Sequence, residues 1–143
     1  MKIQVTAKVS EVQLHQVMQI WLAGNLQAHD FVAPDYWKQN YAEVAKQIKK
    51  ATLILATENN SVLGFLGLVD GYIAGLFVNE DQQRRGIGTK LVQAAEQIQP
   101  ELTLSVYQKN KNAVEFYHAH SFKILKTDVD EETNEIEYLM SNQ

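Results

Sequence analysis

Residues 84–89, with the sequence Arg-Arg-Gly-Ile-Gly-Thr, are the stretch of the chain best suited to binding an anion. A helix that begins near Gly86 leaves the backbone N–H groups of its first turn without intrahelical acceptors. The helix dipole adds partial positive charge at the same place. Gly86 and Gly88 lack β-carbons, so a ligand can approach the backbone closely, and Arg84 and Arg85 supply further donors. These features favour a phosphate or pyrophosphate ligand.

The segment does not match the common nucleotide-binding motifs. It lacks the G-x-x-x-x-G-K-[ST] pattern of a P-loop and the G-x-G-x-x-G pattern of a dinucleotide-binding turn, and no acidic residue follows at the distance the latter requires. Taken alone, residues 84–89 are equally compatible with an ordinary helix start whose arginines are solvated.

The elements that precede this segment follow from capping signals and hydrophobic periodicity. Residues 2–7 form a strand candidate, and Ser10 is the expected N-cap of a first helix. Gly24 is expected to end that helix. Residues 26–36 are expected to form a loop, in which Pro34 starts a second helix.

The rest of the chain predicts three consecutive strands, then a helix, a strand, a short helix and two strands. Their ranges are 51–58, 61–70, 72–78, 87–98, 102–107, 112–120, 122–130 and 135–140. This mixture predicts an α+β fold, with a mostly antiparallel sheet and helices packed on it. One parallel, right-handed crossover is expected between the strands on either side of the 87–98 helix. The length suits a single domain over residues 1–143.

Composition restricts the classes of partner. The formal net charge of −4 argues against a general nucleic-acid binder. The chain has no cysteine, which excludes disulfides, thiolate nucleophiles and cysteine-based zinc sites, and we expect no metal. The N-terminal residues lack the apolar core of a signal peptide, and no apolar run reaches transmembrane length. We therefore expect no membrane partner, a cytoplasmic location, and a monomer or homodimer.

Two motifs together resemble those of a known superfamily. The segment 83–88, Gln-Arg-Arg-Gly-Ile-Gly, resembles the Q/R-x-x-G-x-G/A pyrophosphate loop of the GNAT superfamily, the acyl-CoA-dependent N-acyltransferases. Downstream, four residues match that superfamily's N-x-x-A-x-x-F-Y pattern: Asn110, Ala113, Phe116 and Tyr117. The element order also matches over nearly the whole chain. The resemblance implies a twisted sheet of six to seven strands, splayed between the fourth and fifth, with about four flanking helices.

A further resemblance concerns residues 29–31. The His29-Asp30-Phe31 segment is similar to the HDF-like or HPF-like segment of a small bacterial branch of the superfamily, whose members acetylate amines on proteins or small molecules. The resemblance implies that His29 and Phe31 contact the acceptor substrate. Tyr72, at the start of its strand, is expected to line the same acceptor pocket.

The resemblance implies acetyl-CoA as the acyl donor. Backbone amides of the glycine-bearing loop would hold its pyrophosphate, nearby arginines would add charge, and the pantetheine arm would pair with the preceding strand like an added strand. The residues implied are Phe77, Val78, Gln83, Arg84, Arg85, Gly86, Gly88, Thr89 and Asn110. Asn110 is also a plausible N-cap. Lys90 is equally suited to a phosphate contact and to a solvated helix face.

Tyr117 is the expected general acid. Attack of an amine on a thioester, through a tetrahedral intermediate, expels a thiolate, which benefits from a proton because a thiol has a pKa of about 8.5. A phenol with a pKa of about 10 can donate that proton if its helix positions it. Without the surrounding motif, the simpler interpretation is a core aromatic residue beside Phe116.

The general base has no clear candidate in the sequence. The strand 72–78 lacks the carboxylate that many superfamily members carry there, and Asp70 is expected in a turn. His29 titrates in a useful range but is more often structural in such a position. The acidic segment 128–137 is interpreted as a solvated hairpin turn, and the functional alternative is an acidic rim that attracts cationic amines. The missing carboxylate suggests a preference for α-amines, which have a pKa of about 7.7–8 against about 10.4 for lysine.

The sequence therefore predicts an acetyl-CoA-dependent N-acetyltransferase whose acceptor is a protein or small-molecule amine. Two alternatives stay open: a non-catalytic acyl-CoA sensor or interaction module on the same fold, and a generic nucleotide-phosphate binder. One departure from the superfamily pattern concerns Ser121, which stands where glycine is usual. A left-handed helix cap there would strain the serine by about 1 kcal/mol.

Overall fold

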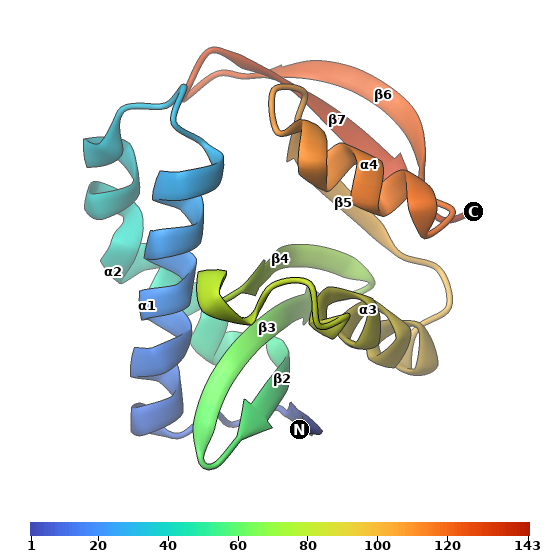
Figure 1. Ribbon diagram of the computed structural model, residues 1–143. Coiled ribbons are helices and arrows are strands. Elements are labelled where there is room, and N and C mark those ends of the chain that lie inside the picture. Colours follow the sequence, from blue (N-terminus) through green and yellow to red (C-terminus); the bar gives the residue numbers. More distant parts are fainter.

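The structure is a computed structural model that describes all residues from 1 to 143, and it has a seven-stranded sheet with four α-helices (Figure 1). The strands are β1 (Lys2–Thr6), β2 (Thr52–Glu58), β3 (Ser61–Val69), β4 (Tyr72–Val78), β5 (Thr103–Tyr107), β6 (Lys123–Asp130) and β7 (Glu135–Ser141). The helices are α1 (Glu11–Ala28), α2 (Pro34–Lys50), α3 (Ile87–Ile98) and α4 (Lys111–Ala119), with a short 3₁₀ turn, η1 (Glu80–Gln82). The predicted α+β class and element order are confirmed.

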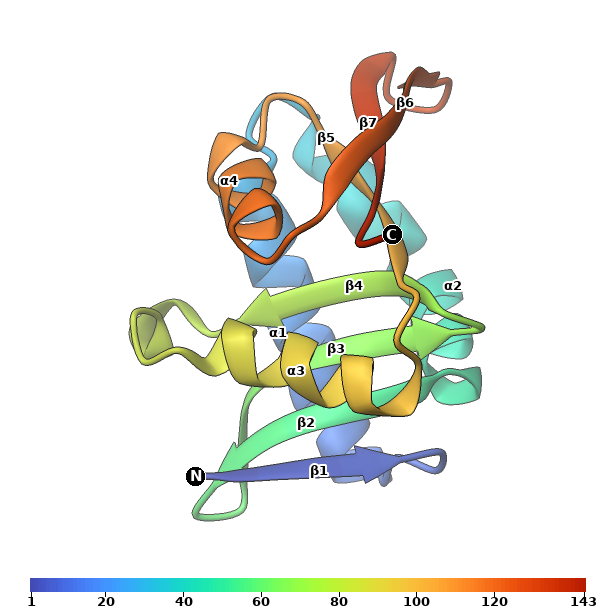
Figure 2. The ribbon, with the colours of Figure 1, turned by 90° about the vertical axis from the view of Figure 1, so that its right-hand side faces the viewer.

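The sheet has the strand order β1-β2-β3-β4-β5-β7-β6 and is antiparallel everywhere except between β4 and β5. That parallel pair is short, because only Tyr72 and Ile73 of β4 pair with β5. Beyond Ile73 the two strands separate (Figure 2), so the predicted splay is confirmed. The remainder of β4 keeps its pairing to β3 on one side and leaves its other edge without a strand partner.

Two hydrophobic clusters lie on opposite faces of the central strands. Leu53 and Leu55 of β2 pack with α1 and α2, whereas Ile54 and Ala56 of the same strand pack with α3. Successive side chains of a strand point to opposite faces, so a strand covered on both sides reads as a continuous apolar run. This packing fixes α1 on one face and the start of α3 on the other, beside the open edge of β4 (Figure 2).

Helix α1 is longer than the sequence predicts, because it continues through Gly24 to Ala28. A β-carbon at Gly24 would lie 2.5 Å from Cδ1 of Phe77 on β4. Glycine therefore serves at this position to let the helix approach the strand closely, and it does not end the helix. The predicted start of α2 at Pro34 and the N-cap at Ser10, whose side chain accepts a hydrogen bond from Gln13, are confirmed.

The residue that follows α4 adopts the strained conformation considered above. Ser121 has a φ of 71°, in the left-handed region that favours glycine. The backbone N–H of Phe122 then donates to the carbonyl of Tyr117, closing the helix end. No helix in the structure is long and apolar enough to cross a membrane.

Candidate active site

The loop between η1 and α3 presents free backbone donors. Gly86, the N-cap of α3, has a φ of 76°, and Arg84 also lies in the left-handed region with a φ of 69°. The first backbone hydrogen bond of the helix runs from the N–H of Lys90 to the carbonyl of Gly86 at 3.1 Å. The N–H groups of Gly86, Gly88 and Thr89 therefore have no acceptor within the protein and can bind an anion.

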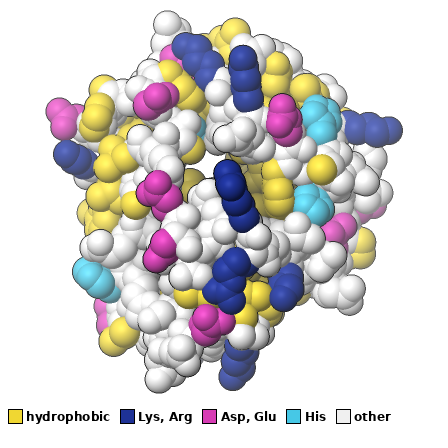
Figure 3. Space-filling view, in the orientation of Figure 1, with side chains coloured by type: hydrophobic (Ala, Val, Ile, Leu, Met, Phe, Trp, Pro, Cys, Tyr) yellow, Lys and Arg dark blue, Asp and Glu magenta, His cyan; other side chains and the backbone are white.

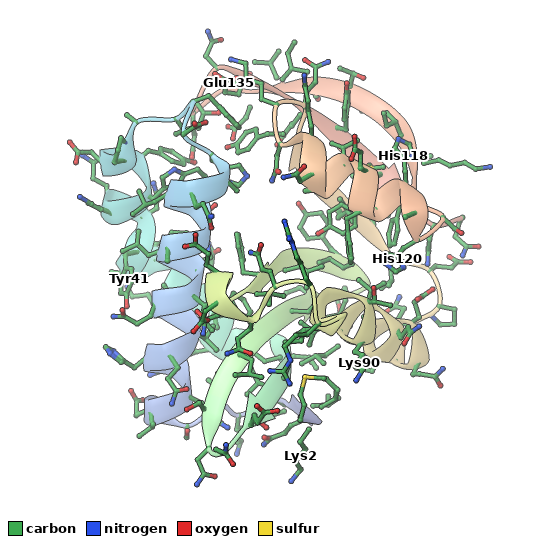
Figure 4. The ribbon with its side chains drawn as sticks, viewed as in Figure 1. Lys2, Tyr41, Lys90, His118, His120 and Glu135 are labelled. Carbon is green, nitrogen blue, oxygen red and sulfur yellow. The ribbon has the colours of Figure 1, made fainter.

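Gly86 and Gly88 are glycines for different structural reasons. A β-carbon at Gly86 would meet no atom within 4 Å, so this residue is needed for its left-handed backbone and leaves open space for a ligand. A β-carbon at Gly88 would lie 3.2 Å from the ring of Phe116 on α4. Next to it, the hydroxyl of Thr89 lies 3.1 Å from Nε2 of His120, at the end of α4 (Figure 4). The two sequence motifs are thus in direct contact.

The two arginines before Gly86 differ in their partners. The guanidinium of Arg85 lies 3.1 Å from Glu58 and 2.5 Å from the side-chain oxygen of Gln82, and it lowers the pKa of the Glu58 carboxyl. Arg84 is exposed and has no ion pair. Lys90, on α3, is likewise exposed and unpaired. Figure 3 shows Lys and Arg side chains gathered over the start of α3, beside a central hollow.

Three connected cavities follow the splay of the sheet. An entry cavity of about 510 Å³ lies along the open edge of β4 and is lined by Phe77, Val78 and Gln83 together with the start of α4. It shares Leu76, Phe77, Asn110 and Ala113 with a central cavity of about 310 Å³.

On the opposite side, the central cavity shares Tyr72 and Gly75 with an apolar groove of about 460 Å³ between α2 and β4. Neighbouring cavities share lining residues, so the three lie side by side along the splay, and together they are called the passage below. The entry cavity reaches Gln83, which precedes the loop that leads to α3, and the apolar groove lies beside Tyr72.

Tyr117 lies at the centre of this passage. It is buried on α4, lines the central cavity and packs edge-on against Phe116 and Phe122, with ring centroids 5.4 and 5.6 Å away. Its hydroxyl makes no hydrogen bond within the protein. Burial, and to a smaller extent the electrostatic interaction with Tyr72, raise the pKa of Tyr117 well above its usual value. The side chain therefore holds its proton firmly in the resting protein.

His29 connects α1 to the beginning of α4. Asn110 caps α4, its Oδ1 accepting from the N–H of Ala113 at 3.4 Å, so its Nδ2 is the group that donates to Nε2 of His29 at 3.1 Å. The other ring nitrogen, Nδ1, then donates to Asn25 at 2.9 Å. Burial lowers the pKa of His29 to about 4. His29 lines the central cavity as a neutral ring with both nitrogens engaged, so it cannot act as a general base near pH 7.

Phe31 does not line any of the three cavities. Its ring packs edge-on against His29 and Tyr107, with centroids 5.7 and 5.6 Å away, and the ammonium of Lys109 lies over it at 5.5 Å. Phe31 therefore supports the cavity wall from behind. Tyr72, in contrast, lines both the central cavity and the apolar groove, on the side where an acceptor was expected.

The acidic segment 128–137 is only partly the solvated turn that the sequence suggested. Asp130 accepts a hydrogen bond from the hydroxyl of Tyr107 at 2.7 Å, and Glu132 accepts one from Tyr36 at 2.5 Å. Glu137 is half-buried on β7 and lines the central cavity. Sequence reasoning considered the acidic segment as a whole and did not single out this carboxylate. The alternation of a strand over residues 135–141 places Glu137 on one face, but only the pairing with β5 shows which face meets the cavity.

Comparison with known proteins agrees with this geometry. The pattern of the acetyltransferase (GNAT) family matches residues 15–122. The peptidyl-lysine N-acetyltransferase YiaC of Escherichia coli K12 is 33% identical over 131 residues, covering 90% of each chain. The peptidyl-lysine N-acetyltransferase YjaB of the same organism is 30% identical over 118 residues, covering 81% of this chain and 80% of the relative.

Solved structures show the same fold. The solution structure of apo YjaB from Escherichia coli superimposes with a TM-score of 0.84 and 25% identity, covering 99% of this chain and 98% of the other. The PaiA N-acetyltransferase of Thermoplasma acidophilum, solved with coenzyme A, has a TM-score of 0.79 and 18% identity, covering 100% and 99%.

Similarity of this extent, in sequence and in fold, defines an N-acetyltransferase. The family pattern spans well over half of the chain, and the chain belongs to the acetyltransferase (GNAT) family. No three or more His, Cys, Asp or Glu side chains are grouped so that they could hold a metal ion.

Proposed function

We propose that this enzyme transfers an acetyl group from acetyl-CoA to the side-chain amine of a lysine in a protein or peptide. The observation that carries the proposal is the row of cavities along the splay, which begins at Gln83, next in sequence to the loop with the free N–H groups, and reaches Tyr117. When bound, acetyl-CoA supplies the acetyl group as an activated thioester. Two relatives named peptidyl-lysine N-acetyltransferases, 33% and 30% identical, support lysine as the acceptor.

The residues of the passage fit the parts of coenzyme A. The backbone N–H groups of Gly86, Gly88 and Thr89 receive the pyrophosphate, and Arg84 adds charge, since its guanidinium has no ion pair in the protein. The open edge of β4 at Phe77 and Val78 offers backbone groups to the amides of the pantetheine arm. Asn110 has only one N–H left for the arm, because its other polar groups contact His29 and Ala113.

In this proposal, amine attack and proton transfer take place in the central cavity. The acceptor amine enters from the side of Tyr72 and attacks the thioester carbonyl, giving a tetrahedral intermediate. Tyr117 donates its proton to the departing sulfur. The Tyr117 phenol is protonated near pH 7, as a general acid must be, and the leaving thiolate is the base that takes its proton.

The earlier expectation of a preference for α-amines rested on the absence of a carboxylate near the acceptor. Glu137 lines the central cavity, which removes that premise. The mostly apolar groove next to Tyr72 also offers room for residues on either side of an acceptor lysine. Both observations favour a peptide lysine over a small amine.

The test is release of coenzyme A thiol from acetyl-CoA across a panel of amines, with peptides that carry a lysine and a blocked N-terminus among them. Tyr117→Phe is expected to lower kcat about 10²–10⁴-fold, since that is the usual contribution of a general acid. Binding of coenzyme A is expected to stay the same. Tyr138→Phe is the matched control, because Tyr138 lies on β7 outside the three cavities. Wild-type turnover in Tyr117→Phe, or coenzyme A binding without any thiol release, would contradict the proposal.

A further inference from the structure

Glu137 is the only residue with a charged side chain that lines the central cavity. The other lining side chains are apolar, aromatic or neutral and polar, and His29 is neutral because both of its ring nitrogens are engaged. Glu137 has no ion pair and no hydrogen bond to a protein side chain. A half-buried carboxylate without a partner is costly unless a cation joins it. The cavity is therefore built around an unmatched negative charge.

The position of Glu137 is fixed by strand pairing. Glu137 on β7 lies directly opposite Tyr107 on β5 in the antiparallel register, so the two side chains share one face of the sheet. The hydroxyl of Tyr107 already donates to Asp130, at 2.7 Å, and not to Glu137. Tyr107 packs with the cluster beside α1 and α2, and Tyr117 belongs to the cluster on the other face. The central cavity lies where the two faces meet at the splay, and Glu137 from β7 and Tyr117 from α4 both line it.

The surroundings of Glu137 favour binding a proton. Burial is the main effect, and the carboxylates of Asp130 and Asp128 on β6 add to it; all three raise the pKa of Glu137. The neighbouring cations are already paired, Lys126 with Asp128 at 3.3 Å and Lys109 with Glu135 at 3.0 Å. No cation of the protein pairs with Glu137 or lowers its pKa.

We propose that Glu137 binds the ammonium group of the acceptor lysine and takes its proton before the amine attacks. This inference rests on the proposed function above. A lysine with a pKa of about 10.4 is almost entirely protonated near pH 7, so a carboxylate at the acceptor gives the reaction its nucleophile.

Acetyl transfer to the lysine releases one proton overall. One proton moves from the ammonium to a carboxylate oxygen of Glu137. The freed nitrogen lone pair forms the C–N bond, the C–S bond breaks, and the sulfur takes the proton of Tyr117. A second proton, lost by the attacking nitrogen, returns to Tyr117. Glu137 then releases its proton to solvent, so the products are the acetylated lysine, coenzyme A thiol and one proton.

The experiment compares Glu137→Gln with Glu131→Gln, an exposed carboxylate of the same hairpin that lines none of the cavities. Turnover is measured at saturating acetyl-CoA, from pH 6.5 to 10, on a lysine peptide with a blocked N-terminus. Glu137→Gln is expected to lower kcat/KM about 100-fold or more near pH 7, as loss of a general base does. The deficit is expected to shrink as the pH nears the lysine pKa of about 10.4, where the free amine is abundant. Glu131→Gln is expected to behave like the wild type.

Glu137→Asp serves as the second variant, because it keeps the charge and should retain more activity than Glu137→Gln. Coenzyme A affinity, measured by calorimetry, is expected to be unchanged in both variants, which shows that they are folded. Equal activity of Glu137→Gln and wild type, or a deficit that is the same at every pH, overturns the inference while leaving the proposed function intact. A wild-type enzyme that acetylates no lysine peptide overturns both.

Discussion

The amide Nδ2 of Asn110 lies 3.1 Å from Nε2 of His29 and joins the start of α4 to the end of α1 across the opening of the central cavity. Asn110 belongs to the motif that also contains Tyr117, whereas His29 belongs to the segment between the first two helices. Both ring nitrogens of His29 are hydrogen-bonded, one to Asn25 on α1 and the other to Asn110 at the start of α4, so the histidine links the two helices. The contact sets where α4, and with it Tyr117, stands relative to α1.

Replacing Asn110 by alanine is expected to destabilise the fold. The substitution removes the N-cap of α4 and leaves a buried nitrogen of His29 without a partner, which together cost about 2–3 kcal/mol. The midpoint of urea denaturation measures the loss. Asn112→Ala is the control, since Asn112 is exposed and makes no side-chain hydrogen bond, and it is expected to change stability by less than about 0.5 kcal/mol. Equal effects of the two substitutions would contradict this account.

Acid is expected to destabilise the protein through His29. The unfolded chain binds a proton at this residue near pH 6.5, but the folded protein resists protonation until about pH 4. Stability from this residue is therefore complete above pH 6.5 and is lost as the pH falls towards 4, by about 3 kcal/mol in all. Urea denaturation at several pH values measures the slope. His29→Gln removes the titrating group and is expected to flatten that slope; a slope equal to that of the wild type would refute the assignment.

Gly24→Ala is expected to disturb both stability and coenzyme A binding. The new β-carbon would stand 2.5 Å from the ring of Phe77, so either α1 or β4 must move, at a cost of about 1–3 kcal/mol. Phe77 lines the entry cavity, so affinity for coenzyme A should fall as well. Gly67→Ala on β3 is the control, because the nearest atom to its β-carbon would be 3.8 Å away. Calorimetry with coenzyme A and thermal melting distinguish the two variants.

The two arginines of the loop are expected to contribute unequally to coenzyme A binding. Arg84 has no ion pair, whereas Arg85 is paired with Glu58 at 3.1 Å and must give up that contact to reach a phosphate. Arg84→Ala is expected to weaken coenzyme A binding about tenfold, since a hydrogen bond to a charged group contributes about 1.5–3 kcal/mol. Arg85→Ala should have the smaller effect. Titrations at low and high salt test this order, and the reverse order would show that Glu58 releases Arg85 on binding.

Much of the fold could be predicted because its signals are local. Ser10 and Pro34 mark helix starts through capping and backbone geometry, and apolar runs bounded by turn residues locate β2 to β4. The end of α1 was missed because Gly24 resembles a helix stop in sequence. Its actual role is steric and involves Phe77, which lies 53 positions further along the chain. The sequence next to Gly24 gives no sign of that contact.

The sequence by itself determined the glycine-bearing start of α3 with its free N–H groups, the capping role of Asn110 and the presence of Tyr117 one helix later, since these depend on residue type and short spacing. Only the tertiary structure decided which groups share the central cavity. Pairing of β5 with β7 brings Glu137 to that cavity, and the His29–Asn110 hydrogen bond takes His29 out of proton transfer. Burial and pairing partners come from residues distant in the chain, and they fix the charge and basicity of each group.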